Sequence, residues 1–174
     1  IVLTTRKFGE GGLIVSLLTR EHGRHAGLVR GGSSKRAAGQ YEPGNQVRAV
    51  WRARLEEQLG NLTCEVETAH AARHLAHPAR LAALISALSL VETALPEREP
   101  HGSLFDSLAA LLVILGEPGW EQSYIRWEMI LLAELGFGID LSCCAATGVN
   151  DQLAYVSPKS GRAVCLSAGE PWKD

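Results

Sequence analysis

The sequence lacks any apolar run close to the roughly 18–20 residues that a membrane-spanning helix needs, and no basic-then-apolar signal peptide opens it. Motifs of common enzyme classes are also missing: there is no GxSxG turn and no HExxH pair, and Gly31–Lys35 lacks the second glycine of a Walker A segment. We therefore expect no membrane association and no catalytic residues. The chain starts at Ile1, inside an expected strand and without a Met, so we expect native residues to be missing.

Cysteine is scarce, with 4 among 174 residues, and two of the four are adjacent, which makes a poor disulfide framework. A reducing, cytoplasmic location is expected. The second half contains two outlines of a zinc knuckle, Cys144-Ala-Ala-Thr147-Gly148 and Cys165-Leu-Ser-Ala168-Gly169. Because Thr147 and Ala168 stand where second thiolates belong, and Cys143 adds only an adjacent thiol, we predict no bound metal and no cofactor.

Charge is distributed unevenly along the chain. Residues 1–60 contain ten Lys and Arg against five Glu, a net charge of +5, whereas residues 61–174 contain seven cations against fourteen acids, a net charge of −7. The two halves together give the overall net charge of −2. A basic half joined to an acidic half indicates modules with different partners, the first of them polyanionic, although chance segregation of solvated charge would give the same numbers.

Alternating apolar residues predict five short strands within residues 1–70, in the segments IVLTT, GLIVSLLT, RHAGLVRG, VRAVWRARL and NLTCEVETA. The second segment is apolar on both faces, as in a closed barrel or a covered sheet. One long connection, RGGSSKRAAGQYEPG, follows the third strand. Five strands with these connections fit the small OB-type barrel, which commonly binds single-stranded nucleic acid.

From about residue 70 the apolar period changes to 3.6 and predicts three helices. The first begins near Pro78, and the second begins at a capping box over Ser103–Asp106. The third runs from about Gln122 to Leu135 and ends at Gly136. The apolar stripes are Leu81, Leu84, Ile85, Leu88, Val91 and Leu95, then Leu104, Leu108, Leu111, Leu112 and Leu115, then Trp127, Ile130, Leu131 and Leu135.

Two further features belong to the second half. The segments 152–156 and 163–166 predict a short hairpin about Pro158–Gly161. His70, His74 and His77 would share one helical face, and without an intervening acid they are expected to be solvated residues rather than metal ligands.

Cations in the first half are the best candidates for a binding site. Arg48, Arg52 and Arg54 share one strand face, and the long connection adds Arg30, Lys35 and Arg36. Tyr41 offers a stacking surface, whereas Trp51 alternates with the inward residues and is expected in the core. Alternatively, part of this ladder only makes cross-strand ion pairs, with Arg52 beside Glu65.

Three segments resemble the bacterial DNA repair protein RecO family: IVLTTRKFGEGGLIVSLLTREHGRHAGLVRGGSSKR, then RWEMILLAELGFGIDLSCCAATG, then LAYVSPKSGRAVC. The likeness covers nearly the whole chain, and its opening segment is specific. It implies an α+β protein: an N-terminal five-stranded OB-type β-barrel over residues 1–70, then a helical domain over 71–174 with a degenerate zinc-knuckle-like insert near 140–168. Family members also continue a little beyond residue 174.

The resemblance implies a recombination mediator, not an enzyme, that is cytoplasmic and associates with the nucleoid during repair. Such proteins bind single- and double-stranded DNA, anneal complementary strands, and with RecR help load the RecA recombinase onto strands coated by single-strand-binding protein. The long connection would be a mobile cationic arm laid along phosphates. The nucleic-acid-binding residues would be Arg24, Arg30, Lys35, Arg36, Arg48, Arg52 and Arg54.

The acidic helical half would receive the C-terminal tail of single-strand-binding protein beside Arg73 or Arg126. Two other classes stay open. One is a non-catalytic scaffold whose basic OB barrel pairs with an acidic protein. The other is an enzyme whose site the sequence does not reveal.

Overall fold

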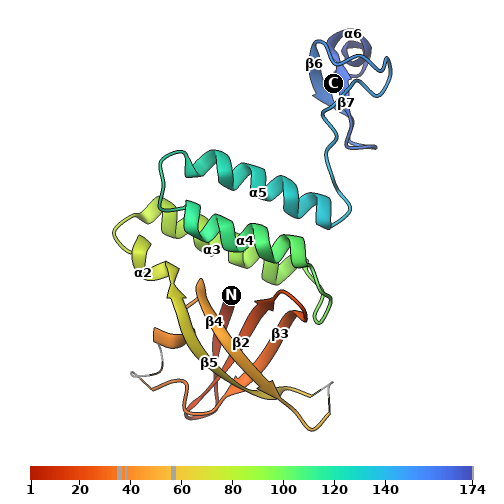
Figure 1. Ribbon diagram of the computed structural model, residues 1–174. Helices are drawn as coiled ribbons and strands as arrows, with labels where there is room; N and C mark the ends of the chain where they lie inside the picture. Colours follow the sequence, from red (N-terminus) through yellow and green to blue (C-terminus); the bar gives the residue numbers. More distant parts are fainter. Residues whose placement is uncertain (35–36, 38, 56–57, 174) are drawn as a thin grey trace. The chain divides into compact units, whose positions relative to one another are not determined.

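A computed structural model describes residues 1–34, 37, 39–55 and 58–173 (Figure 1). It has two compact units, Ile1–Trp127 and Glu128–Asp174, and each is described by itself. This division groups the first helices with the strands, and the predicted domain boundary between residues 70 and 71 stays a prediction. None of the helices among the described residues is long and apolar enough to cross a membrane.

The first unit opens with the five predicted strands, which are confirmed together with the long connection after the third. They are β1 (Val2–Phe8), β2 (Gly12–Thr19), β3 (Gly23–Val29), β4 (Asn45–Arg52) and β5 (Gly60–Ala69). Neighbours in the sheet follow the order β1-β2-β3-β5-β4, and every pairing is antiparallel except β3 with β5. The backbone N–H of Gly44 donates to Val2 O at 2.8 Å, which brings the segment before β4 against β1. This is an OB-type barrel, as predicted.

The parallel pairing of β3 with β5 depends on two glycines. Gly27 lies opposite Gly60, and Trp51 from β4 covers both positions, so that a Cβ atom on Gly60 would collide with the indole ring. A side chain at either position would force Trp51 away. The glycines therefore let β5, and not the preceding strand β4, join the first three strands.

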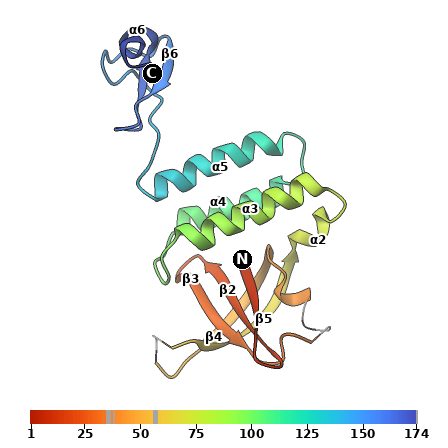
Figure 2. The same ribbon diagram turned by 180° about the vertical axis from the view of Figure 1, so that it is seen from behind.

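β2 is buried on both faces, as its uninterrupted apolar run predicts. Val15 and Leu17 belong to the barrel core, where they pack with Val29 and Leu62. Residues of the opposite face are also inaccessible, and there Ser16 Oγ donates to Glu92 Oε2 at 2.6 Å. Glu92 belongs to a helix, so helices cover the outer side of this strand (Figures 1 and 2).

The helices follow directly from β5. They are α2 (His70–His74), α3 (Pro78–Ala94), α4 (Gly102–Ile114) and α5 (Trp120–Glu134), the last of which ends in the second unit. Pro78 occupies the first turn of α3, and all five leucines predicted for α4 are buried. Two stripe predictions are wrong: Ile85 is 51% exposed and Ile130 is 41% exposed.

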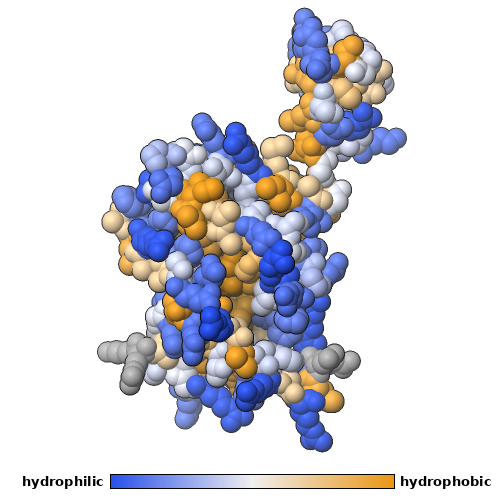
Figure 3. All heavy atoms as spheres, viewed as in Figure 1, coloured by the Kyte–Doolittle hydropathy of each residue, from blue (hydrophilic) through white to orange (hydrophobic). Residues whose placement is uncertain are grey.

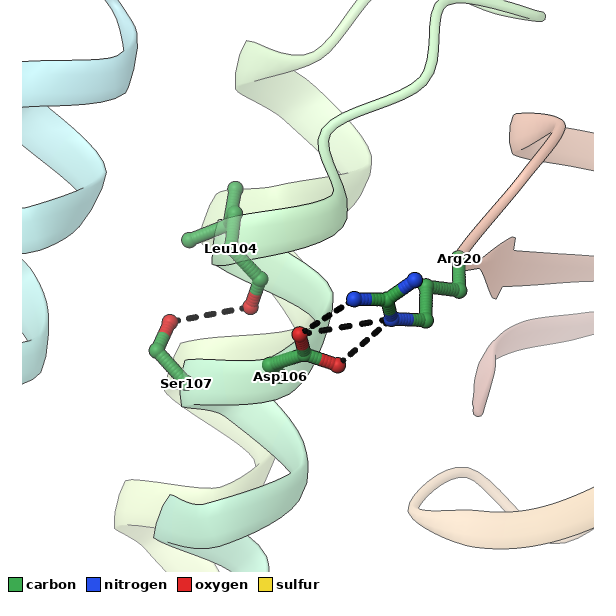
Figure 4. A network of polar contacts seen from close by, with 4 residues as sticks. All are labelled: Arg20, Leu104, Asp106 and Ser107. Carbon is green, nitrogen blue, oxygen red and sulfur yellow. Dashed lines mark hydrogen bonds and ion pairs between the residues drawn. The ribbon is translucent and has the colours of Figure 1, made fainter.

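The predicted capping box is wrong. α4 already begins at Gly102, so Ser103 lies inside the first turn instead of ahead of it. Asp106 instead accepts hydrogen bonds from Arg20, with Nε and Nη2 each 3.0 Å from a carboxylate oxygen (Figure 4). Because both side chains are more than half exposed, water screens the pair and it adds little to stability.

The prediction that His70 and His74 are solvated is also wrong, whereas His77 is exposed. Each of the first two is 2% exposed, because their spacing of four residues turns both rings from α2 toward the interior. Burial lowers the pKa of each ring, and nearby cations, first Arg73 for His70 and Arg80 for His74, lower it further. Both rings are therefore neutral near pH 7.

The second unit holds the predicted hairpin. β6 (Leu153–Val156) pairs antiparallel with β7 (Ala163–Cys165), and α6 (Leu166–Gly169) and a 3₁₀ turn (Glu170–Trp172) follow. Gly136 has a φ of +82°, which confirms the predicted stop of the third helix.

We expect acid to destabilise the first unit through its buried histidines. The unfolded chain takes up protons below about pH 6.5 that the folded rings, with their lowered pKa, do not. The free energy of unfolding contributed by these rings should be constant above that pH and fall below it, by at most about 1.4 kcal/mol per pH unit for each histidine. Urea denaturation from about pH 7.5 to about pH 5 measures this slope.

Two variants separate these rings from the other titrating groups. His74→Leu should show a shallower loss of stability in acid, whereas His77→Gln should keep the wild-type profile, because His77 is exposed in the folded chain. The same slope in all three proteins would contradict the assignment.

Candidate nucleic-acid interface

The structure separates the predicted cations instead of gathering them on one surface. Of the seven, Lys35 and Arg36 lie outside the described residues. The other five, Arg24, Arg30, Arg48, Arg52 and Arg54, fall into three different environments.

Arg24 is held inside the fold. Its side chain is 16% exposed, its Nε donates to Leu95 O at 3.0 Å, and its Nη1 lies 3.3 Å from Glu92 and 3.4 Å from Glu97. Two carboxylates and a carbonyl thus compensate its charge at the end of α3. Arg24 thus joins β3 to the helices.

Arg48, on β4, faces two glutamates of the neighbouring strand β5. It lies opposite Glu65, and its Nη2 is 3.4 Å from Glu67 Oε1. The prediction that Arg52 lies beside Glu65 is wrong, because β5 already begins at Gly60 and Arg52 therefore pairs with Asn61. The acids of β5 thus compensate Arg48 and leave Arg52 without a facing carboxylate.

Arg30 and Arg52 meet at the same residue of β5. Arg30 Nε donates to Asn61 Oδ1 at 3.1 Å, and Asn61 is the register partner of Arg52. Arg54 follows two residues after β4 ends. We call Arg30, Arg52 and Arg54 the cationic rim; all three are exposed, and none forms an ion pair within the described part of the chain.

The rim stands apart from the compensated arginines. With a rise of about 3.3 Å per residue, the Cα atoms of Arg48 and Arg52, four residues apart, are separated by about 13 Å. Those of Arg24 and Arg30, six residues apart, are separated by about 20 Å. An asparagine amide holds one rim guanidinium without neutralising it, and no carboxylate among the described residues pairs with the rim. Such charges are suited to bind phosphate.

The described residues of the long connection are anchored on the barrel, in contrast to the mobile arm that the resemblance implies. Ser33 N–H donates to Gly11 O at 3.3 Å, and Ala37 packs against the barrel core. Tyr41, in a 3₁₀ turn (Gly39–Tyr41), is only 6% exposed, so it is a core residue and its predicted stacking role is wrong. Arg30, the first residue of the connection, therefore lies beside a segment that is hydrogen-bonded to the barrel.

Trp51 is half-buried against the core, as predicted, and also borders a cavity. Its Nε1 donates to Ala26 O at 3.2 Å, and its ring meets His25 edge-on with centroids 4.5 Å apart. The cavity, of about 470 Å³, is lined also by Thr19, His22 and Arg98. A cavity of this size beside an aromatic ring is large enough for a small ring-shaped ligand.

Sequence reasoning missed Arg98. Its φ is +64°, rare for a residue with a side chain, and its N–H donates to Arg24 O at 2.8 Å. Burial lowers the pKa of His25, and the charge of Arg98 lowers it further. The only signal in the sequence is the charged segment between Pro96 and Pro100, which reads as an ordinary helix connection.

Arg73 and Arg126, predicted to bind a protein partner, are exposed on α2 and α5. Apolar side chains are also exposed on the helices of the first unit, among them Val113 at 56% and Ile125 at 58%. Figure 3 shows such apolar residues among polar ones over the helices. Ile125 precedes Arg126 in α5, and both side chains are exposed.

The second unit brings Cys144, Thr147 and Cys165 together. The two Sγ atoms are 3.3 Å apart, and Thr147 Oγ1 lies 3.7 Å from the Sγ of Cys165. A structural zinc site needs four soft ligands, but Ala168 has no donor atom and a threonine hydroxyl replaces a thiolate. Among the described residues no three His, Cys, Asp or Glu side chains are placed to hold a metal, so this donor set does not fit zinc.

Together these features define an α+β protein whose OB-type barrel carries exposed arginines, without ion pairs in the described part of the chain, and is followed by helices. The family described as "Recombination protein O N terminal" matches residues 1–70, and "Recombination protein O C terminal" matches residues 75–174. "DNA repair protein RecO" of Rhodospirillum centenum is 59% identical over 176 residues, which cover 100% of this chain and 70% of the relative. Its counterpart in Rhodospirillum rubrum is 51% identical and covers 99% and 71%.

A third relative, "DNA repair protein RecO" of Afipia carboxidovorans, is 50% identical over 100% of this chain and 70% of its own length. The chain belongs to the RecO family of DNA repair proteins. The predicted resemblance is confirmed.

We expect replacement of Arg24 to lower the free energy of unfolding and replacement of Arg52 to leave it nearly unchanged. Arg24→Gln strands Glu92 and the carbonyl of Leu95, both partly enclosed, and should lower the free energy of unfolding by about 1–3 kcal/mol. Arg52→Gln removes an exposed side chain that forms no ion pair with any described residue, and it should change the free energy of unfolding by less than about 0.5 kcal/mol. Urea denaturation at neutral pH measures both, and equal losses would refute the distinction.

Proposed function

We propose that the barrel binds single- and double-stranded DNA through the cationic rim, joined by Lys35 and Arg36 of the long connection. The observation that carries the proposal is that Arg30, Arg52 and Arg54 stand exposed without ion pairs in the described part of the chain, while Arg24 and Arg48 are compensated. Membership of a family named for DNA repair supports it.

We further propose that the bound strands anneal without any covalent step. Two strands repel through their phosphates, and arginines that displace condensed counterions reduce this repulsion while bases stay free to pair. Such work needs clustered positive charge rather than a nucleophile or a general base. In the same proposal the protein acts with RecR to load RecA onto strands coated by single-strand-binding protein.

The acidic, apolar C-terminal tail of single-strand-binding protein is proposed to bind the helices beside Arg126 or Arg73. Ile125 supports the first site, because it presents an exposed apolar side chain next to a cation. Such a pair suits a peptide that ends in apolar residues and a carboxylate.

The competing function is a scaffold whose rim binds an acidic protein. The same uncompensated arginines would serve it, so salt dependence with a nucleic acid decides between the two. DNA binding that is absent, or independent of salt, would favour the scaffold.

Arg52→Glu should weaken binding to a fluorescent oligonucleotide and flatten the plot of log K against log salt by about one unit of slope for each phosphate that the variant no longer binds. The matched control is Lys159→Glu, which changes the net charge equally in the second unit, at an exposed residue. It should leave the slope unchanged. An unaltered slope in Arg52→Glu, or equal changes in both variants, would defeat the assignment of the rim.

Arg126→Ala should reduce capture of a peptide that carries the acidic tail, because it removes the cation beside Ile125. Immobilised peptide and purified protein measure this directly, with Arg80→Ala as a control of the same size on α3. Equal capture by both variants and the wild type would exclude the site at Arg126 and leave Arg73 to be tested in the same way.

A further inference from the structure

The second unit places two buried thiols in contact. Cys144 and Cys165 are 1% and 4% exposed, their Sγ atoms are 3.3 Å apart, and Cys165 N–H donates to Cys144 Sγ at 3.2 Å. Both cysteines are free. A disulfide bond is about 2.05 Å long, so an approach of about 1.2 Å would join the two sulfurs.

The turn around Cys144 favours its thiolate. Hydrogen bonds from the Thr147 hydroxyl and the Cys165 N–H, with smaller contributions from the amides of Thr147 and Ala146, lower the pKa of Cys144 to about 6. In a zinc knuckle, backbone amides that donate to a cysteine sulfur stabilise the thiolate that binds the metal. Here Thr147 and Ala168 replace two of the four ligands, so the set of metal ligands is incomplete. A charged sulfur therefore faces a second thiol, and the thiolate is the nucleophilic form of cysteine.

We propose that Cys144 and Cys165 are an oxidative modification site, at which hydrogen peroxide converts the two thiols into a disulfide that closes the hairpin unit where a metal ion would otherwise do so. The proposal is independent of DNA binding. It concerns the second unit alone.

The chemistry proceeds in two steps. The Cys144 thiolate attacks one oxygen of the peroxide, the O–O bond breaks, and the departing hydroxide takes a proton to become water, which leaves a sulfenic acid on Cys144. The Cys165 sulfur then attacks the sulfenic sulfur, the S–O bond breaks, and the second water leaves with the thiol proton. Two electrons pass from the thiols to the peroxide, which becomes two molecules of water.

The other two cysteines of the chain differ from this pair in their surroundings. Cys143 contacts Arg162, whose Nη2 lies 3.7 Å from its sulfur. Cys64 is buried in the barrel, where desolvation raises its pKa to about 11, so its thiol should resist the same oxidant. The pair is buried, so an oxidant can reach it only when the small second unit opens briefly. Hydrogen peroxide is small enough to enter then, whereas a bulky disulfide reagent is not.

The test treats the reduced full chain with hydrogen peroxide, blocks the remaining thiols by alkylation, and maps tryptic peptides by mass. Lys159 and Arg162 lie between the two cysteines, so trypsin separates them and the disulfide appears as a linked pair of peptides. The pair should form in the wild type and in Cys143→Ser, disappear in Cys144→Ser and Cys165→Ser, and be reversed by dithiothreitol. Cys64 should remain alkylated throughout.

Three results would overturn the proposal. One is a link that persists in Cys144→Ser, which would assign it to Cys143. Another is oxidation of Cys144 to sulfinic acid while Cys165 remains free for alkylation. The third is protection of both thiols by one equivalent of Zn²⁺ added to the reduced protein, which would make the pair a metal site. Circular dichroism of each reduced variant shows whether a lost link reflects a lost thiol or a lost fold.

Discussion

The fold of the first unit depends on the burial of β2 on both faces. Val15 and Leu17 fill the barrel, and the opposite face would meet water if the barrel stood alone. Helices must therefore cover it, and the short Ser16–Glu92 hydrogen bond fixes α3 against this strand. A bare barrel of this sequence would expose several apolar side chains, each worth about 1.5–3 kcal/mol when buried.

This cover determines which arginines remain available. Glu92 reaches Ser16 with one oxygen and Arg24 with the other, so the helical layer takes one cation of the barrel for its own attachment. On the far side, the acids of β5 compensate Arg48. Among the described residues, the arginines without ion pairs lie at the end of the barrel where β5 starts, at the cationic rim. A basic half of the chain thus becomes a localised basic surface.

The positions of strands and helices followed from apolar periodicity, and so did the burial of β2 and of Trp51. The register between β4 and β5 could not be predicted in this way. The predicted pairing of Arg52 with Glu65 and the observed pairing of Arg48 with Glu65 differ by four residues, and both place an arginine opposite a glutamate. The buried His70 and His74 were missed because an imidazole reads as polar in any hydropathy pattern. Asp106 was assigned to a helix cap because its partner, Arg20, lies 86 residues away in the chain. Partners this distant leave no local pattern.

The parallel pairing at Gly27 and Gly60 bears on how the chain reaches its native state. The long connection and the whole of β4 separate the two positions in sequence, so the barrel closes through a pairing between residues far apart in the chain. The hairpins and the leucine-rich helices need only neighbours in sequence. Closure at the two glycines would therefore come late in folding, and until then the edges of β3 and β5 would stand open to another chain.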